Sequence, residues 1–126
     1  MFGWFVKNTG ILEKSLDAVW LRNQVISNNI ANVDTPGFKS SKVEFENILR
    51  SAMENGELSS DGTAGMDGLE PVVVENRWTT MRMDGNNVDI DSEMVDLARN
   101  SIRYDALVQK ISKEFGRIRM AIREGK

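Results

Sequence analysis

The sequence contains neither cysteine nor histidine. The lack of cysteine excludes disulfides, thiol nucleophiles and thiolate metal sites, and the lack of histidine removes the commonest general base and metal ligand. The apolar opening, residues 1–6, is far shorter than the roughly 20 residues that a membrane span requires. Zinc and triad chemistry is therefore nearly excluded, and we expect no cofactor, no metal ion and no direct membrane span.

The opening segment also lacks the charged start and small-residue cleavage site of a secretory signal. We therefore expect it to belong to the mature protein. Three of its residues are aromatic. Soluble monomers tend to avoid exposed aromatic patches, so the segment is expected either to anchor on a neighbouring molecule or to fray.

The chain is short, and its charge is unevenly distributed. Its 126 residues suffice for one domain, but a loosely structured middle leaves little for a large private core. The net charge of −3 divides into +1 for residues 1–39, −9 for residues 40–96 and +5 for residues 97–126. The acidic middle and the basic tail attract each other within or between molecules, or are simply solvated faces; the sequence leaves both open.

The first third carries the heptad spacing of a coiled coil. We call its positions the first seam: Leu12, Leu16, Val19, Asn23, Ile26, Ile30 and Val33. Asn23 is its polar exception. The pattern predicts a helix of about twenty residues, as the seam spans about six turns. A second apolar group, Trp20, Leu21 and Val25, indicates either more than one contacting helix or a middle segment folded back on this face.

The first helix is predicted to stop in a tight turn. Pro36 removes a helical backbone donor and biases Thr35 toward an extended conformation. Pro36 also suits the second position of a type II turn, and Gly37 suits the third, where φ is positive.

The middle of the chain has weaker patterns. Residues 40–49 fit either a short strand or a helical turn. Residues 54–68 are rich in glycine and polar residues and predict a mobile linker. Residues 70–83 favour a strand within a small hairpin or flap, followed by a turn at residues 84–86. We divide the chain at residues 1–39, 40–88 and 89–126.

Residues 84–93 resemble a calcium loop only superficially. Val88, Asp89 and Val95 occupy places where such a loop needs a ligand, a glycine and a bidentate glutamate. A helix start explains the acidic residues better, with Asp91 or Ser92 as the cap.

A second, longer helix is predicted to run to about Arg123. We call its positions the second seam: Met94, Leu97, Ser101, Tyr104, Val108, Ile111, Phe115, Ile118 and Ile122. At about 45 Å this helix is longer than its partner, so one end projects beyond the pair or meets another subunit. We therefore predict a mainly α fold, in which the terminal helices pair as an antiparallel coiled-coil-like hairpin around a small β or irregular, partly mobile middle segment.

The end of the first helix also carries a family motif. Residues 29–39 resemble the Ala-Asn-x-x-Thr-Pro-Gly-aromatic signature of bacterial flagellar rod and hook proteins. The matching residues are Ala31, Asn32, Thr35, Pro36, Gly37 and Phe38. Residues 85–94 and 100–115 are similar to the approach and C-terminal helix of the same family, most of all its proximal rod members. The related rod protein FlgC, or another helical-hairpin axial protein, is the alternative within this group.

The resemblance implies a structural function rather than an enzyme. Members of this family are exported through the flagellar export apparatus without a cleaved signal, and they polymerise into the torque-transmitting rod of the basal body, which crosses the periplasm. Their partners are copies of themselves, other rod proteins, the basal-body ring and the adapter at the rod base. The terminal helices form the inner layer, so the two seams would carry packing and the motif would shape the junction. We expect the isolated subunit to be weakly folded.

Two other classes of function are weighed against this one. The basic tail, residues 110–123, has the charge for a nucleic-acid-binding module, but the chain is acidic and has no aromatic stacking platform there, so we expect no nucleic-acid partner. An enzyme using only carboxylates would rely on Asp84, Asp89 and Asp91. The sequence supplies no group that would perturb their pKa values.

Overall fold

The computed structural model of the chain describes residues 2–58, 65–80 and 82–125. Its elements, in order, are α1 (Phe2–Ala31), β1 (Ser41–Glu44), α2 (Glu46–Glu54), a short 3-10 helix (Met66–Gly68), β2 (Val72–Glu75) and α3 (Ile90–Glu124). Two long terminal helices thus enclose a middle segment of short elements. The predicted fold class is confirmed.

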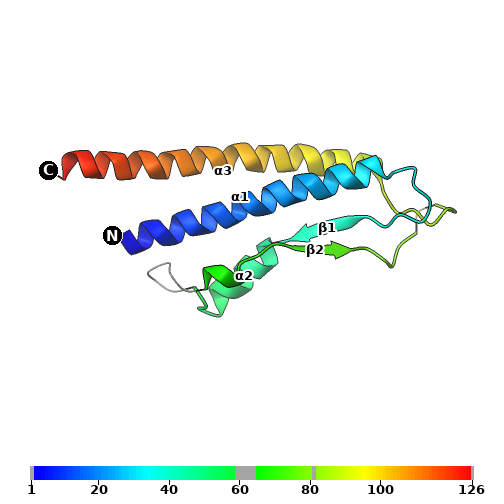
Figure 1. The fold of residues 1–126 in the computed structure, drawn as a ribbon, viewed down its shortest axis with the longest axis horizontal. Coiled ribbons are helices and arrows are strands. Elements are labelled where there is room, and N and C mark those ends of the chain that lie inside the picture. Colours follow the sequence, from blue (N-terminus) through cyan, green and yellow to red (C-terminus); the bar gives the residue numbers. More distant parts are fainter. Residues whose placement is uncertain (1, 59–64, 81, 126) are drawn as a thin grey trace.

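The two long helices pack side by side in opposite directions (Figure 1). Phe5 of α1 meets Phe115 of α3, with ring centroids 6.0 Å apart. Further along, the Asn100 side chain donates to the carbonyl of Val19, and Asn29 reaches Glu93. Positions rise along α1 as they fall along α3, so the pair is antiparallel, and the C-terminal end of α3 extends past the start of α1 (Figure 1).

α1 begins well before the first seam. The prediction of a helix of about twenty residues is wrong at its start, because helix continues back to Phe2. This first turn contains no acidic residue that would mark a helix start. Tertiary contact stabilises it instead, through the pairing of Phe5 with Phe115.

α3 begins with a side-chain cap. Asp89 accepts hydrogen bonds from the backbone N–H groups of Asp91 (3.1 Å) and Ser92 (3.3 Å). The predicted cap, Asp91 or Ser92, is therefore wrong: the cap is Asp89, two residues before Asp91. The acidic residues of the first turn and Arg123 in the last turn complement the helix dipole, as expected.

The two strands form a small antiparallel ribbon. Its register runs from Ser41 opposite Glu75 to Glu44 opposite Val72. The strand predicted in residues 70–83 therefore exists but is shorter, and the predicted local hairpin is wrong: its partner lies some thirty residues earlier. Residues 40–49 contain both alternatives considered for them, a strand followed by the start of α2.

The middle segment folds back on α1. Ala18 of α1 shares a buried cluster with Phe45, Ala52, Leu58 and Leu69. Leu58 and Leu69 are 7% and 0% exposed, so the predicted linker is packed at Leu58 and just beyond its far end; residues 59–64 lie outside the described residues. α1 is thus the central element, between α3 and the ribbon with α2 (Figure 1).

Candidate assembly site

A buried asparagine joins three elements where the end of α1 lies beside the start of α3. Asn29 is 0% exposed. Its Nδ2 donates to the Ser41 carbonyl (2.8 Å) and to Glu93 Oε2 (3.2 Å), while its Oδ1 accepts from the Ser41 N–H (3.0 Å). One side chain therefore holds α1, β1 and α3 together, and its amide satisfies backbone groups that burial would otherwise leave unpaired.

A second buried asparagine closes the turn after α1. Asn86 is 0% exposed, and its Nδ2 donates to the carbonyls of Asn32 (2.9 Å), Val33 (3.1 Å) and Thr35 (2.8 Å). Its Oδ1 accepts from the N–H of Val88 (2.8 Å). The chain just before α3 is thereby fixed against the chain just after α1.

The motif residues build the turn that Asn86 holds. The N–H of Phe38 donates to the Thr35 carbonyl (3.2 Å), and Gly37 has φ of 73°, as the predicted turn requires. The Thr35 hydroxyl donates to Asn32 Oδ1 (3.1 Å), and the Gly37 N–H donates to the Asp84 carbonyl (2.8 Å). Ala31 is the last residue of α1, and Pro36 is exposed. The turn predicted at residues 84–86 is present but begins earlier, because the Gly85 N–H donates to the Arg82 carbonyl (3.1 Å) and closes a turn over residues 82–85.

Asn87 ties the loop before α3 to the ribbon. Its Oδ1 accepts from the Ser40 N–H (2.7 Å), and its Nδ2 donates to the Asn76 carbonyl (2.7 Å). Its own N–H donates to the Phe38 carbonyl (3.3 Å). Asn29, Asn86 and Asn87 together form what we call the helix junction.

The first seam lies mostly inside the molecule. Leu12, Val19 and Ile26 are buried, and Leu16, Asn23, Ile30 and Val33 are half-buried. Val33 lies in the turn beyond the end of α1.

The second seam coincides only in part with the face that α3 turns to α1. The buried residues of α3 are Glu93, Asn100 and Glu114. Leu97, Ile111 and Ile118 are half-buried, whereas Met94, Ser101, Tyr104, Val108, Phe115 and Ile122 are exposed. The contact face therefore shares Leu97, Ile111 and Ile118 with the predicted seam, and its buried polar residues each lie one position before a seam residue, so it is rotated by only part of the roughly 100° between successive residues. We call the exposed apolar residues Met94, Tyr104, Val108, Phe115 and Ile122 the α3 stripe.

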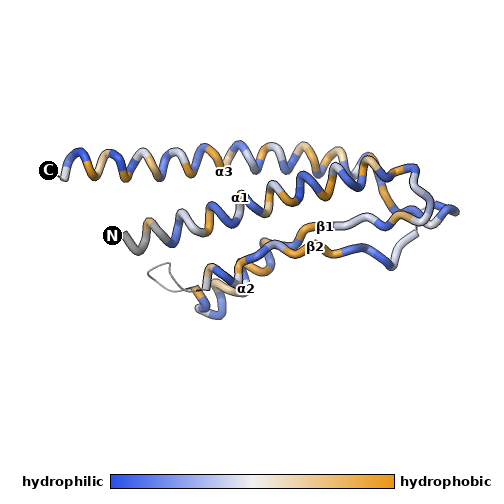
Figure 2. Tube along the Cα trace, viewed as in Figure 1, coloured by the Kyte–Doolittle hydropathy of each residue, from blue (hydrophilic) through white to orange (hydrophobic). Residues whose placement is uncertain are grey.

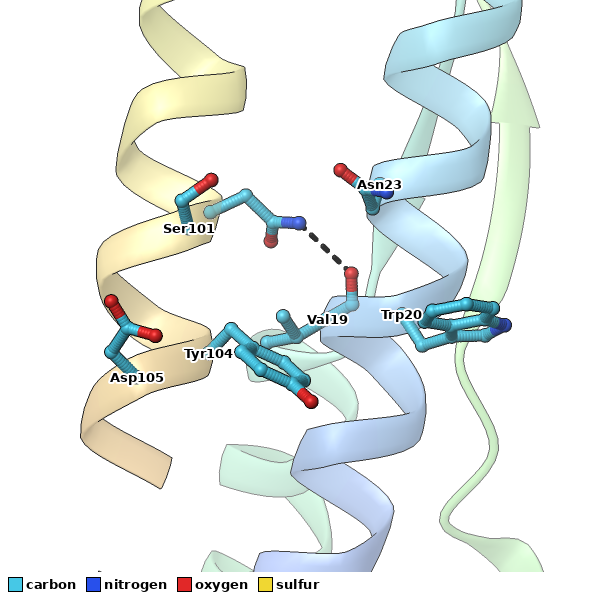
Figure 3. Close-up of a pocket in the computed structure, with 7 residues that line it drawn as sticks. Val19, Trp20, Asn23, Ser101, Tyr104 and Asp105 are labelled. Atoms are coloured by element: carbon cyan, nitrogen blue, oxygen red, sulfur yellow. Dashed lines mark hydrogen bonds between the residues drawn. The ribbon is translucent and has the colours of Figure 1, made fainter. Parts of the chain in front are cut away.

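The polar positions of the two seams meet at one cavity (Figure 3). Asn23 and Ser101 line a space of about 280 Å³ between the helices, together with Trp20, Tyr104 and Asn100. Asn100 donates to the Val19 carbonyl (2.9 Å), and its Oδ1 has no partner among the described residues. The Tyr104 ring points toward α1, whereas Trp20 points away from α3 (Figure 3). The packing between α1 and α3 therefore leaves a cavity at these polar positions.

Charged residues from α1, α2 and α3 meet at a second place along the helix pair. The Arg22 guanidinium donates two hydrogen bonds to Glu46 (2.9 and 2.8 Å), and Arg103 of α3 lies 3.6 Å from the same carboxylate. Burial alone would raise the pKa of Glu46, but these two arginines bring it below its usual value. Burial raises the pKa of Glu93, which the hydrogen bond from Asn29 offsets in part.

Comparison with known proteins identifies the family. The model of the family described as "Flagella basal body rod protein" matches residues 22–39, the end of α1 with the motif turn. The flagellar basal body rod protein FlgB of Bacillus subtilis is 35% identical over 119 residues, covering 91% of this chain and 92% of that protein. The chain belongs to the FlgB family of flagellar basal-body rod proteins.

Further FlgB relatives extend the match. FlgB of Borreliella burgdorferi is 33% identical over 132 residues, covering 94% of this chain and 98% of its own. FlgB of Escherichia coli is 29% identical over 103 residues, covering 72% and 75%. The chain is thus a structural subunit of the flagellar basal-body rod and assembles there with other rod components. The FlgC and nucleic-acid alternatives are not favoured.

Two of the three carboxylates considered for an enzyme, Asp84 and Asp89, have structural partners in this FlgB family member, and the third, Asp91, is exposed. Asp89 caps α3, and Asp84 accepts from the N–H of Asn86 (3.0 Å). No group of three metal-ligating side chains occurs among the described residues. Likewise, none of the helices in the described part of the chain is long and apolar enough to cross a membrane.

Sequence reasoning missed most of the helix junction. Asparagine is usually exposed, so Asn29, Asn86 and Asn87 gave no core signal. Their positions beside the motif turn and the turn at Gly85 were the available clue. The buried face of α3 also had a signal, because Glu93, Asn100 and Glu114 are spaced by multiples of seven.

Proposed function

We propose that this rod subunit polymerises through the α3 stripe, which packs against neighbouring subunits to form the inner layer of a torque-transmitting shaft. The exposed apolar residues of α3 carry this proposal. Met94 is 53% exposed, Phe115 49% and Ile122 62%. Figure 2 shows hydrophobic positions recurring along the whole length of α3, including the end that extends past α1.

The energetics favour burial of this stripe. Burying one large apolar side chain contributes about 1.5–3 kcal/mol, so five positions repeated on every subunit could outweigh the entropy lost on assembly. Phe115 touches Phe5 of α1 and Tyr104 borders the cavity between the helices, so these two stripe residues lie at the edge of the face that α1 covers. Met94, Val108 and Ile122 are exposed beyond that edge and are available for intermolecular contact. The other seam residues of α3 lie between these two faces and would contribute to both.

Family membership supports further partners. We infer that the chain contacts copies of itself, the basal-body ring and the rod-base adapter, and that the flagellar export apparatus delivers it across the membrane without cleaving a signal. The rod it joins would cross the periplasm. We also infer that it has no catalytic role, since Asp84 and Asp89 are used in capping and turn formation.

A charge placed in the stripe tests the proposal. Val108→Asp should fold normally, because the side chain is 38% exposed, but should reduce incorporation into isolated basal bodies at least roughly tenfold, because burying an unpaired charge is costly. Gln109→Asp, one residue further on an exposed position, is the matched control and should incorporate normally. Equal incorporation of both variants would rule out the stripe as the assembly surface.

A further inference from the structure

The loop between β2 and the helix junction exposes large apolar side chains. We call residues 76–80 and 82–84 the tip loop; residue 81 lies outside the described residues and is not part of this surface. Trp78 is 94% exposed and Met83 is 107% exposed. Tryptophan is the residue most enriched at binding hot spots, and monomeric proteins rarely leave it uncovered.

Hydrogen bonds fix the conformation of residues 76–79 in this loop. The Trp78 N–H donates to Asn76 Oδ1 (3.3 Å), and Asn76 Nδ2 donates to the Thr79 hydroxyl (2.8 Å). Buried Asn87 in turn donates to the Asn76 carbonyl (2.7 Å). Trp78 is therefore presented outward by an ordered turn that is anchored to the helix junction, which lowers the entropy cost of binding.

Acidic side chains outnumber basic ones at the tip end once ion pairs within the chain are set aside, although Lys39 also lies there and donates to the Gly85 carbonyl. Arg77 lies 3.4 Å from Glu75, and Arg82 lies 3.9 Å from Asp84. Asp34 and Asp91 are exposed and form no ion pair with another described residue. A partner for this end should therefore combine apolar side chains with positive charge.

The opposite end of the molecule has that chemistry. Met120 and Ile122 are 60% and 62% exposed at the C-terminal end of α3. Arg119 and Arg123 flank them and form no ion pair within the described ranges. Ile122 lies 32 residues along α3 from Ile90, about 48 Å, so this end cannot reach the tip loop of its own chain.

We propose that the tip loop binds the C-terminal end of the last helix of an axially adjacent rod subunit. Trp78 packs on the apolar side chains of that helix end and on its arginines, whose guanidinium groups stack on indole rings. Such a contact joins two different surfaces and therefore continues along a shaft instead of closing on itself. The proposal rests on the chain being a rod subunit and adds an axial contact to the lateral one of the α3 stripe.

Photo-crosslinking tests which segment Trp78 meets. The full chain carries benzoylphenylalanine in place of Trp78, as the only copy of the subunit in the cell, and isolated basal bodies are irradiated and digested for mass spectrometry. We expect adducts with the basic C-terminal helix end of a rod subunit. The same group in place of Met53, an exposed residue of α2, is the control and should label other segments. Trp78 adducts to a ring protein, to another rod segment, or no adduct in particles containing the variant would overturn the proposal.

A truncation measures the contribution of Trp78. Trp78→Ala should reduce the number of complete rods at least roughly tenfold, as expected for an aromatic hot spot, and Trp78→Phe should restore most of them. Complete rods in normal number with Trp78→Ala would contradict the axial contact. That result would not affect the proposed assembly through the α3 stripe, which is tested separately by Val108→Asp and its control.

Discussion

At the scale of single residues, amide side chains fix the geometry of this rod subunit. Asn29, Asn86 and Asn87 are almost completely buried, and each one pairs with backbone groups of another segment. An apolar residue of similar size would leave those groups unpaired, which costs more than the net gain of an ordinary hydrogen bond. The junction therefore depends on chemistry as well as volume.

Replacing Asn86 tests this dependence. Asn86→Ala removes the donors to three carbonyls after α1 and should lower the free energy of unfolding by roughly 2–3 kcal/mol. Urea denaturation followed by circular dichroism measures the change. Asn47→Ala, at an exposed position of α2, is the control and should change stability by less than about 0.5 kcal/mol. Similar losses in both variants would contradict the role given to Asn86.

Glu93 predicts a pH dependence. Its pKa is raised above the ordinary 4.5, so the folded state binds the proton more tightly than the unfolded state. The free energy of unfolding should therefore fall as pH rises from 4.5 through the raised value. Glu93→Gln should remove this decrease and be more stable than the parent at neutral pH, with the difference vanishing in acid. Denaturation curves at several pH values measure this dependence, and Glu54→Gln, at an exposed position, is the control and should keep it. If the free energy of unfolding of Glu93→Gln fell with pH as steeply as that of the parent, the prediction would be refuted.

Residue positions show where the sequence was informative. The motif turn was predictable because Pro36 and Gly37 each have one dominant backbone preference, and Gly37 has φ of 73°. The buried asparagines were not predictable, because their burial depends on carbonyls that only the fold brings near them.

At the scale of elements, the helices are defined by local signals and the ribbon by distant ones. α3 was predicted nearly to its ends, because its apolar period, its acidic start and its basic end agree. The partner of β2 was not, because pairing between residues 41–44 and 72–75 has no local signature. The face of α3 was misjudged because the exposed apolar residues of the seam give the same sequence signal as the covered ones; under the proposed function their hydrophobicity reflects contacts with neighbouring subunits.

Substitutions at two glycines test the effects of backbone strain and of helix propensity independently. A side chain on either Gly37 or Gly116 would meet nothing within 4 Å, so packing is unaffected. Gly37→Ala should destabilise by about 1–2 kcal/mol because φ is positive there. Gly116→Ala, inside α3, should instead stabilise by about 0.5–1 kcal/mol. Urea denaturation of the two variants measures both effects, and changes of the same sign would contradict this assignment of backbone conformation.

At the scale of the whole molecule, the subunit is an elongated body with incomplete surfaces. Its core is the small cluster around Ala18 and Leu69, while the α3 stripe and the tip loop are left open. A basic helix end and a largely acidic tip lie at opposite ends of this body (Figure 1). These features fit a subunit whose packing is completed by its neighbours.

The most direct measurement is the reactivity of a thiol in the α3 stripe before and after assembly. The natural chain has no cysteine, so Val108→Cys introduces a single reactive site, and Gln109→Cys provides the control. Maleimide labelling of Val108→Cys should be fast in the free subunit and strongly slowed in isolated basal bodies, while Gln109→Cys should be labelled readily in both. Equal labelling of Val108→Cys in the free and assembled states would contradict the account.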